Sequence, residues 1–453
     1  MPHPPARFRA TVAHFARAAA VAAFCVATPA QANGRFPSAQ HLVVGPGAAA
    51  DALALRTTFG VLTSADAGRS WQWRCEEMLG YSYTAVWDPP LALGASLPGA
   101  RLLVGLTDGL TASQDACAAS PVGPLQGRFV GDLTTSPDGG TVWVVSSDNR
   151  PNGLYVSRDG GSSFAAFGRT VDGVFFETVE VAPSDPRRLY LTGVTRDEPQ
   201  RAVLYRSDDG GATLRELPWM GPPVERLYVS GIDPRDPAVL YLRATLPGAT
   251  TTALLRASDG GTTVRELTRL DDAMRGFALS DDGRRVFVGS PDAGLLRSVD
   301  GGAFARVAGY QVQCLRFHAG ALYVCANELA DGFALGRSTD DGAQVTALLR
   351  LGDLRAPNTC PAGSTWTTRC AALWALVQSG LRPLRDAGPD TGPVDAGGAD
   401  GVDGATARPG PTDSGRGCAC GVVGHAAPGA HRGAGLVLAL GLCRRRKRRV
   451  SRR

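Results

Sequence analysis

Short runs of apolar residues recur along residues 40–352, and clusters of Pro, Asp and Gly separate them. One pair of runs, Val179–Val181 and Leu189–Leu191, flanks the turn sequence Pro-Ser-Asp-Pro, and Val229–Leu242 repeats this arrangement. Alternation of apolar and polar residues with a period of two is typical of β-strands, and turn residues between two such runs predict a hairpin. The pattern therefore predicts an all-β domain built from consecutive hairpins.

A second kind of turn recurs between other strands, and its clearest copy is Ser157-Arg-Asp-Gly-Gly-Ser-Ser-Phe164. Gly tolerates the positive φ of a tight turn, while Ser and Asp side chains make hydrogen bonds within it. These residue types favour a structural role; calcium binding is the alternative, although the spacing differs from that of an EF-hand loop. The copies share Ser, Asp and Gly at alternate positions, often before an aromatic or apolar residue: Ser64, Asp66, Gly68 and Trp71; Ser157, Asp159, Gly161 and Phe164; Ser207, Asp209 and Gly211; Asp259 and Gly261; Ser298, Asp300 and Gly302; Ser338, Asp340 and Gly342.

The spacing of these turns predicts the architecture. A degenerate copy has Ser113 and Asp115 but Cys117 in place of the Gly, so the copies start at residues 64, 113, 157, 207, 257, 298 and 338, 40–50 residues apart. This is the period of propeller blades, and two hairpins per period make a four-stranded blade. We predict a seven-bladed β-propeller over residues 33–353, with Ser38–Val44 covering an open edge to close the ring. The predicted blades are 40–79, 80–125, 126–172, 173–222, 223–271, 272–309 and 310–352.

The repeated turn resembles the Asp-box (BNR) repeat, and the resemblance covers residues 40–352. That family includes sialidases, sortilin-like receptors, a class of endoglucanases and photosystem-assembly propellers. The resemblance implies the propeller fold but no particular activity, because one fold supports many functions.

The charge of the chain is concentrated at its ends. The 453 residues carry a formal net charge of +5, but residues 1–32 hold three Arg and no acidic residue, and residues 418–453 hold nine basic residues and no acidic one. The rest of the chain therefore has 35 basic and 42 acidic residues, a net charge of about −7. We expect no nucleic-acid partner for this body.

Residues 1–32 have the features of a secretory signal peptide. Three Arg residues precede the apolar run Ala18–Val26, and Ala30-Gln-Ala32 fits a cleavage site after Ala32. The alternative is an alanine-rich buried helix. Export makes the export machinery a partner and permits disulfides.

The C-terminal part changes character twice. Residues 385–417 are mostly Gly, Ala, Pro, Asp and Thr, which predicts a disordered spacer. Residues 418–453 contain Cys418 and Cys420, then the apolar run Leu436–Leu442 and the basic run Arg444–Arg449. This order resembles the MYXO-CTERM sorting signal of bacterial surface proteins, which implies membrane contact through the tail, processing at Cys418 or Cys420 by the sorting machinery, and a place at the cell surface or outer membrane, with release from the cell as an alternative. The uncharged run of 11 residues, 433–443, is short for a membrane span, and a plain basic tail is the alternative.

Six cysteines remain in the body, and an even number in an exported chain predicts disulfides. Six cysteines allow 15 pairings; pairing neighbours in sequence gives Cys75–Cys117, Cys314–Cys325 and Cys360–Cys370. Residues 354–384 would then form a disulfide-bearing cap with a short helix over Cys370–Ser379. Only two His residues lie in the body, with no cluster of ligands, so we expect no metal site and no cofactor.

The innermost strands hold the candidate ligand-binding residues. Aligning these strands by their turns puts Asp132, Glu180 and Arg316 at positions of the same parity, so their side chains are expected to meet at the central channel. Paired carboxylates there suit glycoside chemistry, whereas solvated or mutually paired channel residues are the alternative. A sialidase's set of three arginines and a Tyr/Glu pair cannot be assembled from the sequence. The chain also lacks the second propeller of the endoglucanases, a Ser-His-Asp set and a phosphate loop. The sequence therefore favours a non-enzymatic, surface-displayed module that binds glycan or protein; the alternative is an extracellular glycoside hydrolase, sialidase-like or endoglucanase-like.

Overall fold

The computed structural model describes residues 36–81, 88–95, 100–248, 250–355 and 359–387. All of these belong to one compact unit, residues 1–392. The predicted signal peptide with Ala32, the tail with Cys418 and Cys420, and nearly all of the predicted spacer lie outside the described residues.

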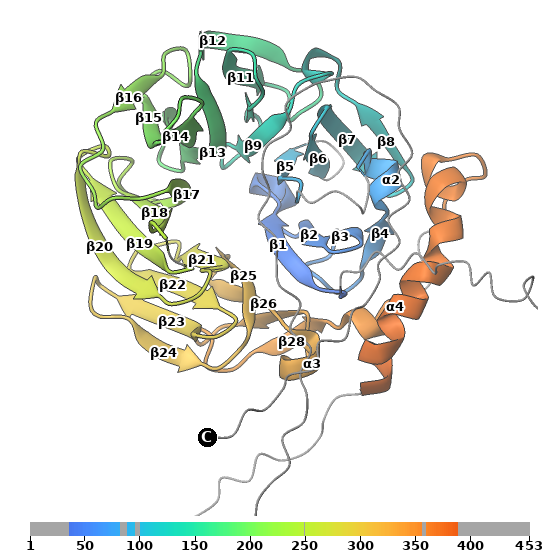
Figure 1. Cartoon of the computed structure of the whole chain (residues 1–453). Coiled ribbons are helices and arrows are strands. Elements are labelled where there is room, and N and C mark those ends of the chain that lie inside the picture. The colour runs from blue at the N-terminus through green and yellow to red at the C-terminus, as the bar shows by residue number, and fades with distance from the viewer. Residues whose placement is uncertain (1–35, 82–87, 96–99, 249, 356–358, 388–453) are drawn as a thin grey trace, which may run out of the picture. The chain divides into compact units, whose positions relative to one another are not determined.

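The chain forms seven antiparallel sheets, each made of four consecutive strands (Figure 1). This confirms the predicted seven-bladed β-propeller, and each predicted blade contains one sheet. The first four sheets comprise β1 (Ala39–Val44), β2 (Leu53–Thr57), β3 (Gly60–Ser64) and β4 (Gln72–Arg74); β5 (Leu91–Ala95), β6 (Ala100–Leu106), β7 (Gly109–Asp115) and β8 (Ala118–Pro121); β9 (Val130–Thr135), β10 (Val142–Ser146), β11 (Asn152–Ser157) and β12 (Ala165–Val171); and β13 (Val174–Ala182), β14 (Asp185–Thr195), β15 (Ala202–Ser207) and β16 (Arg215–Leu217). The other three comprise β17 (Arg226–Ile232), β18 (Leu240–Thr245), β19 (Thr252–Ser258) and β20 (Thr263–Leu270); β21 (Gly276–Leu279), β22 (Arg285–Ser290), β23 (Gly294–Val299) and β24 (Ala305–Ala308); and β25 (Val312–His318), β26 (Ala321–Ala326), β27 (Leu335–Ser338) and β28 (Thr346–Leu349).

The first strands of the seven blades contact one another in a closed circle, from β1 through β5, β9, β13, β17 and β21 to β25 and back to β1. These are the inner strands, and the space that they enclose is here called the central channel. The described helical elements are short apart from the last: η1 (Gly47–Ala49), α2 (Glu76–Leu79), η2 (Gly123–Leu125), α3 (Glu328–Asp331), η3 (Leu351–Asp353), η4 (Trp366–Cys370), η5 (Ala371–Leu373) and α4 (Trp374–Ala387).

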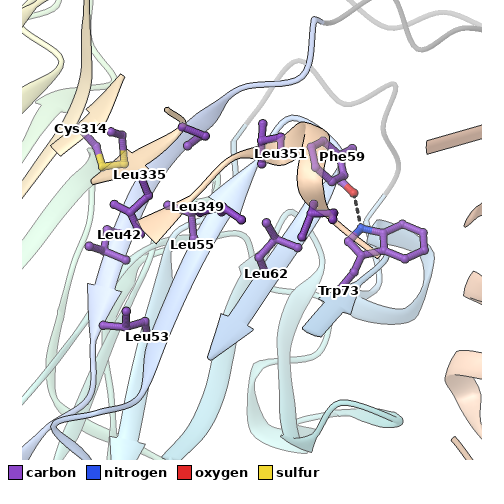
Figure 2. Packing of buried hydrophobic residues seen from close by; sticks show 14 of the residues in the cluster. Leu42, Leu53, Leu55, Phe59, Leu62, Trp73, Cys314, Leu335, Leu349 and Leu351 are labelled. Carbon is purple, nitrogen blue, oxygen red and sulfur yellow. Dashed lines mark hydrogen bonds between the residues drawn. A yellow bond between two sulfur atoms is a disulfide. The ribbon is translucent and has the colours of Figure 1, made fainter. Parts of the chain in front are cut away.

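The core lies in the seams between blades. Because each blade packs on both faces, its middle strands read as continuous apolar runs, as in β10, where Val142, Trp143, Val144 and Val145 are all buried. Figure 2 shows the seam between the first and last blades, where leucines of blade 1 meet leucines of blade 7. Burial of one such side chain stabilises the fold by about 1.5–3 kcal/mol. The labelled leucines of this seam are Leu42, Leu53, Leu55, Leu62, Leu335, Leu349 and Leu351.

The prediction that Ser38–Val44 covers an open edge is wrong. Strand β1 is the inner strand of its own blade and pairs with β2, with Leu42 opposite Leu55. In the described residues every sheet consists of consecutive strands, so no strand is exchanged between the first and last blades. The ring is closed instead by the apolar seam and by the segment that follows blade 7.

That segment, residues 359–387, is here called the C-terminal clasp, and it corrects two predicted disulfides. Cys314 bonds Cys325 across β25 and β26, as predicted, but Cys75 bonds Cys370 and Cys117 bonds Cys360. The clasp runs past the start of α2 and past the β7–β8 turn, which brings each pair of Cα atoms to 5.5 Å. Pairing cysteines that are neighbours in sequence gave two wrong disulfides because the true partners are 295 and 243 residues apart.

The clasp also contacts the first and last blades through polar and aromatic groups. The rings of Trp73 and Trp374 lie 5.3 Å apart, and Arg385 Nε donates a hydrogen bond to the carbonyl oxygen of Gly352, just after blade 7. Helix α4 extends to Ala387, past the predicted end of the cap. It lies along the edge of the ring in Figure 1.

Four of the repeated turns share one hydrogen-bond pattern. The Ser Oγ donates to the Asp carboxylate at 2.6–2.8 Å and accepts from the backbone N–H of the Gly at 2.8–2.9 Å. Gly161 shows why Gly is needed, because its φ is +86° and a Cβ there would lie 2.7 Å from Leu103. The four Ser residues are Ser64, Ser157, Ser207 and Ser338.

The fifth and sixth turns depart from this pattern. Ala257 stands in place of the Ser, and Gly261 N donates to the carbonyl oxygen of Ser258 instead. In the next blade, Asp300 forms a two-point ion pair with Arg284, at 2.6 and 2.8 Å, rather than a hydrogen bond with Ser298. The fold therefore tolerates loss of the Ser-Asp hydrogen bond where another group pairs with the turn N–H or with the Asp carboxylate.

Candidate functional site

The structure brings Asp132, Glu180 and Arg316 together at the central channel. They lie on the inner strands β9, β13 and β25, and their charges interact: Asp132 with Glu180, and Glu180 with Arg316. The side chain of Arg316 is exposed although its strand is at the centre of the ring, so water enters the channel.

Two further residues of this site escaped the sequence analysis. His41 on β1 and Arg56, opposite it on β2, interact electrostatically with each other and with the predicted residues. Arg56 Nη1 donates to the carbonyl oxygen of Pro89, in front of blade 2, whose inner strand is apolar. One signal was present: His41 stands four residues before the turn residue Gly45, as Asp132 stands four before Ser136.

The two carboxylates join neighbouring blades. Thr134 Oγ1 on β9 donates to Glu180 Oε2 on β13 at 3.1 Å, and the backbone N–H of Val179 donates to Asp132 Oδ2 at 3.0 Å. One blade further on, the N–H of Val229 donates to Thr178 Oγ1 at 3.0 Å. A polar side chain of one inner strand thus binds the next strand, and Asp132 occupies this position between blades 3 and 4.

Enclosure by the ring shifts the pKa values of these groups toward their neutral forms. Burial and the nearby charge of Glu180 raise the pKa of Asp132 to about 8, against the effect of the Val179 N–H. Burial raises the pKa of Glu180 to about 7, although Arg316 and the Thr134 hydroxyl oppose this shift. Enclosure by the ring, which removes bulk water, and the charges of Arg56 and Arg316 lower the pKa of His41 to about 3. At neutral pH the cluster therefore has a neutral imidazole, a largely protonated Asp132 and a Glu180 near its titration midpoint.

The guanidinium of Arg316 and the imidazole of His41 are the groups that face the water of the channel. Among the described residues, neither side chain has a hydrogen-bond or ion-pair partner, and both are exposed. Because the surrounding ring removes much of the bulk water from this exposed group, the pKa of Arg316 is lowered, but the group keeps its charge at neutral pH. This arrangement suits contact with an acceptor or an anionic group entering the channel.

The described residues contain no group of three or more His, Cys, Asp or Glu side chains placed to hold a metal ion. In the same part of the chain, none of the helices has the length and apolar character needed to cross a membrane.

Comparison with known proteins extends only to the fold. No family model matches the chain, and no curated protein matches it. One similar solved structure is the GH74 enzyme of Niastella koreensis, with 14% sequence identity and a TM-score of 0.33 over 68% of this chain and 62% of that one. Another is the GH74 xyloglucanase of Xanthomonas campestris, with 17% sequence identity and a TM-score of 0.33 over 71% of this chain and 66% of that one. A third is the β-propeller domain of Myceliophteria thermophila Cps50 (Swd1), with 13% sequence identity and a TM-score of 0.42 over 65% of this chain and 94% of that one. The chain covers less than two thirds of either GH74 enzyme, and likeness at this level carries no functional argument.

Proposed function

We propose that this protein is exported, displayed at the cell surface by its C-terminal tail, and acts as a non-enzymatic module that binds an extracellular glycan or protein at the propeller channel. One observation carries the binding role: Asp132 and Glu180 are engaged in holding blades 3 and 4 together, while Arg316 and His41 face the water without partners. Groups free to accept a ligand are thus separate from those that stabilise the ring.

Other observations support export of the protein, its membership of the Asp-box group and the sorting role of its tail. The six body cysteines form three disulfides, as is usual in oxidising compartments. The hydrogen-bond pattern shared by four turns supports membership of the Asp-box group. The order of Cys418, the apolar run and the terminal arginines supports a MYXO-CTERM-type tail processed at Cys418 or Cys420.

A glycoside hydrolase is the second candidate, because two carboxyl groups with raised pKa values share one channel. Such a pair is common at acid–base sites, where one group must stay protonated near neutral pH. The hydrogen bonds that hold both groups against neighbouring strands argue against this role, since a catalytic acid needs a free face toward its substrate.

The experiment uses the full chain exported into an oxidising compartment. Binding of this protein is measured on a glycan array and compared between the wild type, Arg316→Ala and Arg187→Ala. Arg187 is an exposed arginine on β14, the second strand of its blade, where it pairs with Asp185. We expect a glycan signal that Arg316→Ala removes and Arg187→Ala retains. A signal unaffected by Arg316→Ala would contradict binding in the channel. Hydrolysis of a bound glycan that Glu180→Gln abolishes would establish the enzyme instead.

A further inference from the structure

A cavity of about 390 Å³ lies between blades 2 and 3, beside the outer strands and apart from the inner-strand cluster. Its walls come from β6, β7, β8, η2 and the turn that precedes β12. The space exists because Ala112, Ala118 and Ser120 present small side chains on this side of blade 2. Its volume falls within the roughly 300–1,000 Å³ typical of small-ligand sites.

Arg101, on β6, is the cation of this cavity. Its Nε is shielded from water and has no hydrogen-bond partner, and in the described residues its guanidinium takes part in no ion pair. A buried donor without an acceptor is costly, and most such groups in folded proteins are satisfied. The N–H groups on Nη1 and Nη2 of the same guanidinium are not shielded and have no partner in the described residues, so these are the donors that a ligand in the cavity would meet.

Asp115, at the end of β7, lines the same cavity. Its Oδ1 accepts hydrogen bonds from the N–H groups of Cys117 and Ala118, at 2.7 and 2.9 Å. No ion pair joins it to Arg101 in the described residues, and its charge interacts with that of Arg74, which lies outside the cavity lining. The rest of the wall has an apolar part with Phe164, Val122 and Pro121, and a polar part with Gln114, Ser162 and Ser163.

From these contacts we infer that the cavity binds a carboxylate-bearing sugar, a uronic acid unit of an extracellular polysaccharide. The carboxylate pairs with the Arg101 guanidinium in the two-point geometry that this fork favours. Sugar hydroxyls donate to the free oxygen of Asp115, and the apolar face of the ring lies against the Phe164 wall. A singly charged carboxylate with hydroxyl donors suits a site that also contains Asp115 better than a doubly charged phosphate does. The site is separate from the channel, so it does not depend on the channel ligand.

The test is calorimetric titration of the full exported chain with tri-galacturonate, with a neutral galactose trisaccharide and with sodium sulfate. We expect tri-galacturonate to bind the wild type and to bind Arg101→Gln about tenfold or more weakly, as loss of a charge-assisted two-point contact predicts. Arg187→Gln is the matched control, an exposed arginine outside the cavity, and it should bind as the wild type does.

A second variant keeps the test valid if Arg101→Gln is poorly folded. Ser120→Trp places a large ring at an exposed position of the cavity rim, so the fold should persist while binding is blocked. Equal binding of the acidic and neutral sugars, or unchanged affinity in both variants, would overturn the inference. Sulfate bound as tightly as tri-galacturonate would show an anion site without sugar recognition. If Arg316→Ala lost binding while Arg101→Gln bound as the wild type does, the sugar site would lie in the channel and not in this cavity.

Discussion

The indole Nε1 of Trp366 donates a hydrogen bond to the backbone carbonyl oxygen of Trp73, at 3.1 Å and across 293 residues of sequence. The backbone N–H of Trp366 also donates to the carbonyl oxygen of Cys117 at 3.0 Å. One residue of the C-terminal clasp therefore binds blade 1 and blade 2 at once. Together with Arg385 beside Gly352, it connects the last blade to the first two. This connection takes the place of strand exchange in holding the ring closed.

The first prediction concerns the two disulfides of the clasp. Cys75→Ser with Cys370→Ser should lower the unfolding free energy more than Cys314→Ser with Cys325→Ser does. With the Cys117–Cys360 bond intact, the loop that Cys75–Cys370 closes has about 50 residues, for which the chain-entropy argument gives roughly 4 kcal/mol, against about 3 kcal/mol for the short loop of Cys314–Cys325. Denaturant unfolding of both variants checks this. Non-reducing peptide mapping of the wild type should yield Cys117 linked to Cys360, and a peptide linking Cys75 to Cys117 would contradict the closure described here.

The second prediction concerns the repeated turns. Ser157→Ala should destabilise the protein by about 1–2 kcal/mol, because the buried N–H of Gly161 loses its acceptor. Ala257→Ser is the matched change in blade 5, where the backbone N–H of Gly261 already donates to the carbonyl oxygen of Ser258, so we expect little effect. Thermal midpoints of the two variants compare them directly. Equal shifts would mean that the Ser hydroxyl does not lock the turn.

The third prediction is a loss of stability as pH rises through the channel pKa values. Asp132 and Glu180 have folded-state pKa values of about 8 and about 7, above the values near 4 of an unfolded chain. The folded state then binds more protons than the unfolded state between about pH 4 and pH 8, so stability falls with rising pH in this window. The thermal midpoint of the wild type should drop by a few degrees (~2–4 °C per kcal/mol) from pH 5 to pH 8. Asp132→Asn combined with Glu180→Gln should reduce this drop, and an identical drop in both proteins would refute the assignment.

The turn carboxylates should act in the opposite direction. The hydroxyl of Ser70 and other donors lower the pKa of Asp66 to about 2, and hydrogen bonds from Ser157 and Ser163 outweigh partial burial to lower the pKa of Asp159 to about 2. Stability from these groups is present above about pH 4 and is lost as pH falls toward 2. Asp159→Asn should therefore flatten the acid limb of the stability profile without changing the alkaline limb. A loss that is independent of pH would point to the geometry of the turn instead of its charge.

The fifth prediction tests surface display. Deletion of residues 417–453 should convert a cell-associated protein into a freely released one, because the proposed processing site, apolar run and basic cluster are removed together. Immunoblots of cell and medium fractions measure the change. Substitution of Cys418 and Cys420 by Ser, with the rest of the tail intact, is the finer control. Continued cell association after the deletion would rule out the sorting role of the tail.

Much of the fold was predictable because its signals are local. A turn such as Ser157–Phe164 closes with hydrogen bonds between residues two to four positions apart, so the turn can be recognised from one short stretch of sequence. Seven such stretches at intervals of 40–50 residues specify blade number and strand count. The parity of the inner strands was also local, and it placed Asp132, Glu180 and Arg316 on the strands that meet at the channel.

The tertiary structure alone decided what depends on contacts around the ring. The partner of Cys75 is Cys370 rather than Cys117, because a disulfide forms between the thiols that the folded chain brings together, whatever their separation in sequence. The same holds for the blade 2–3 cavity, where Arg101 meets residues of another blade. The repeating unit could be predicted from the sequence because its hydrogen bonds join residues close together in the chain. Ring closure and the contacts between blades could not, because they depend on how all seven blades are arranged.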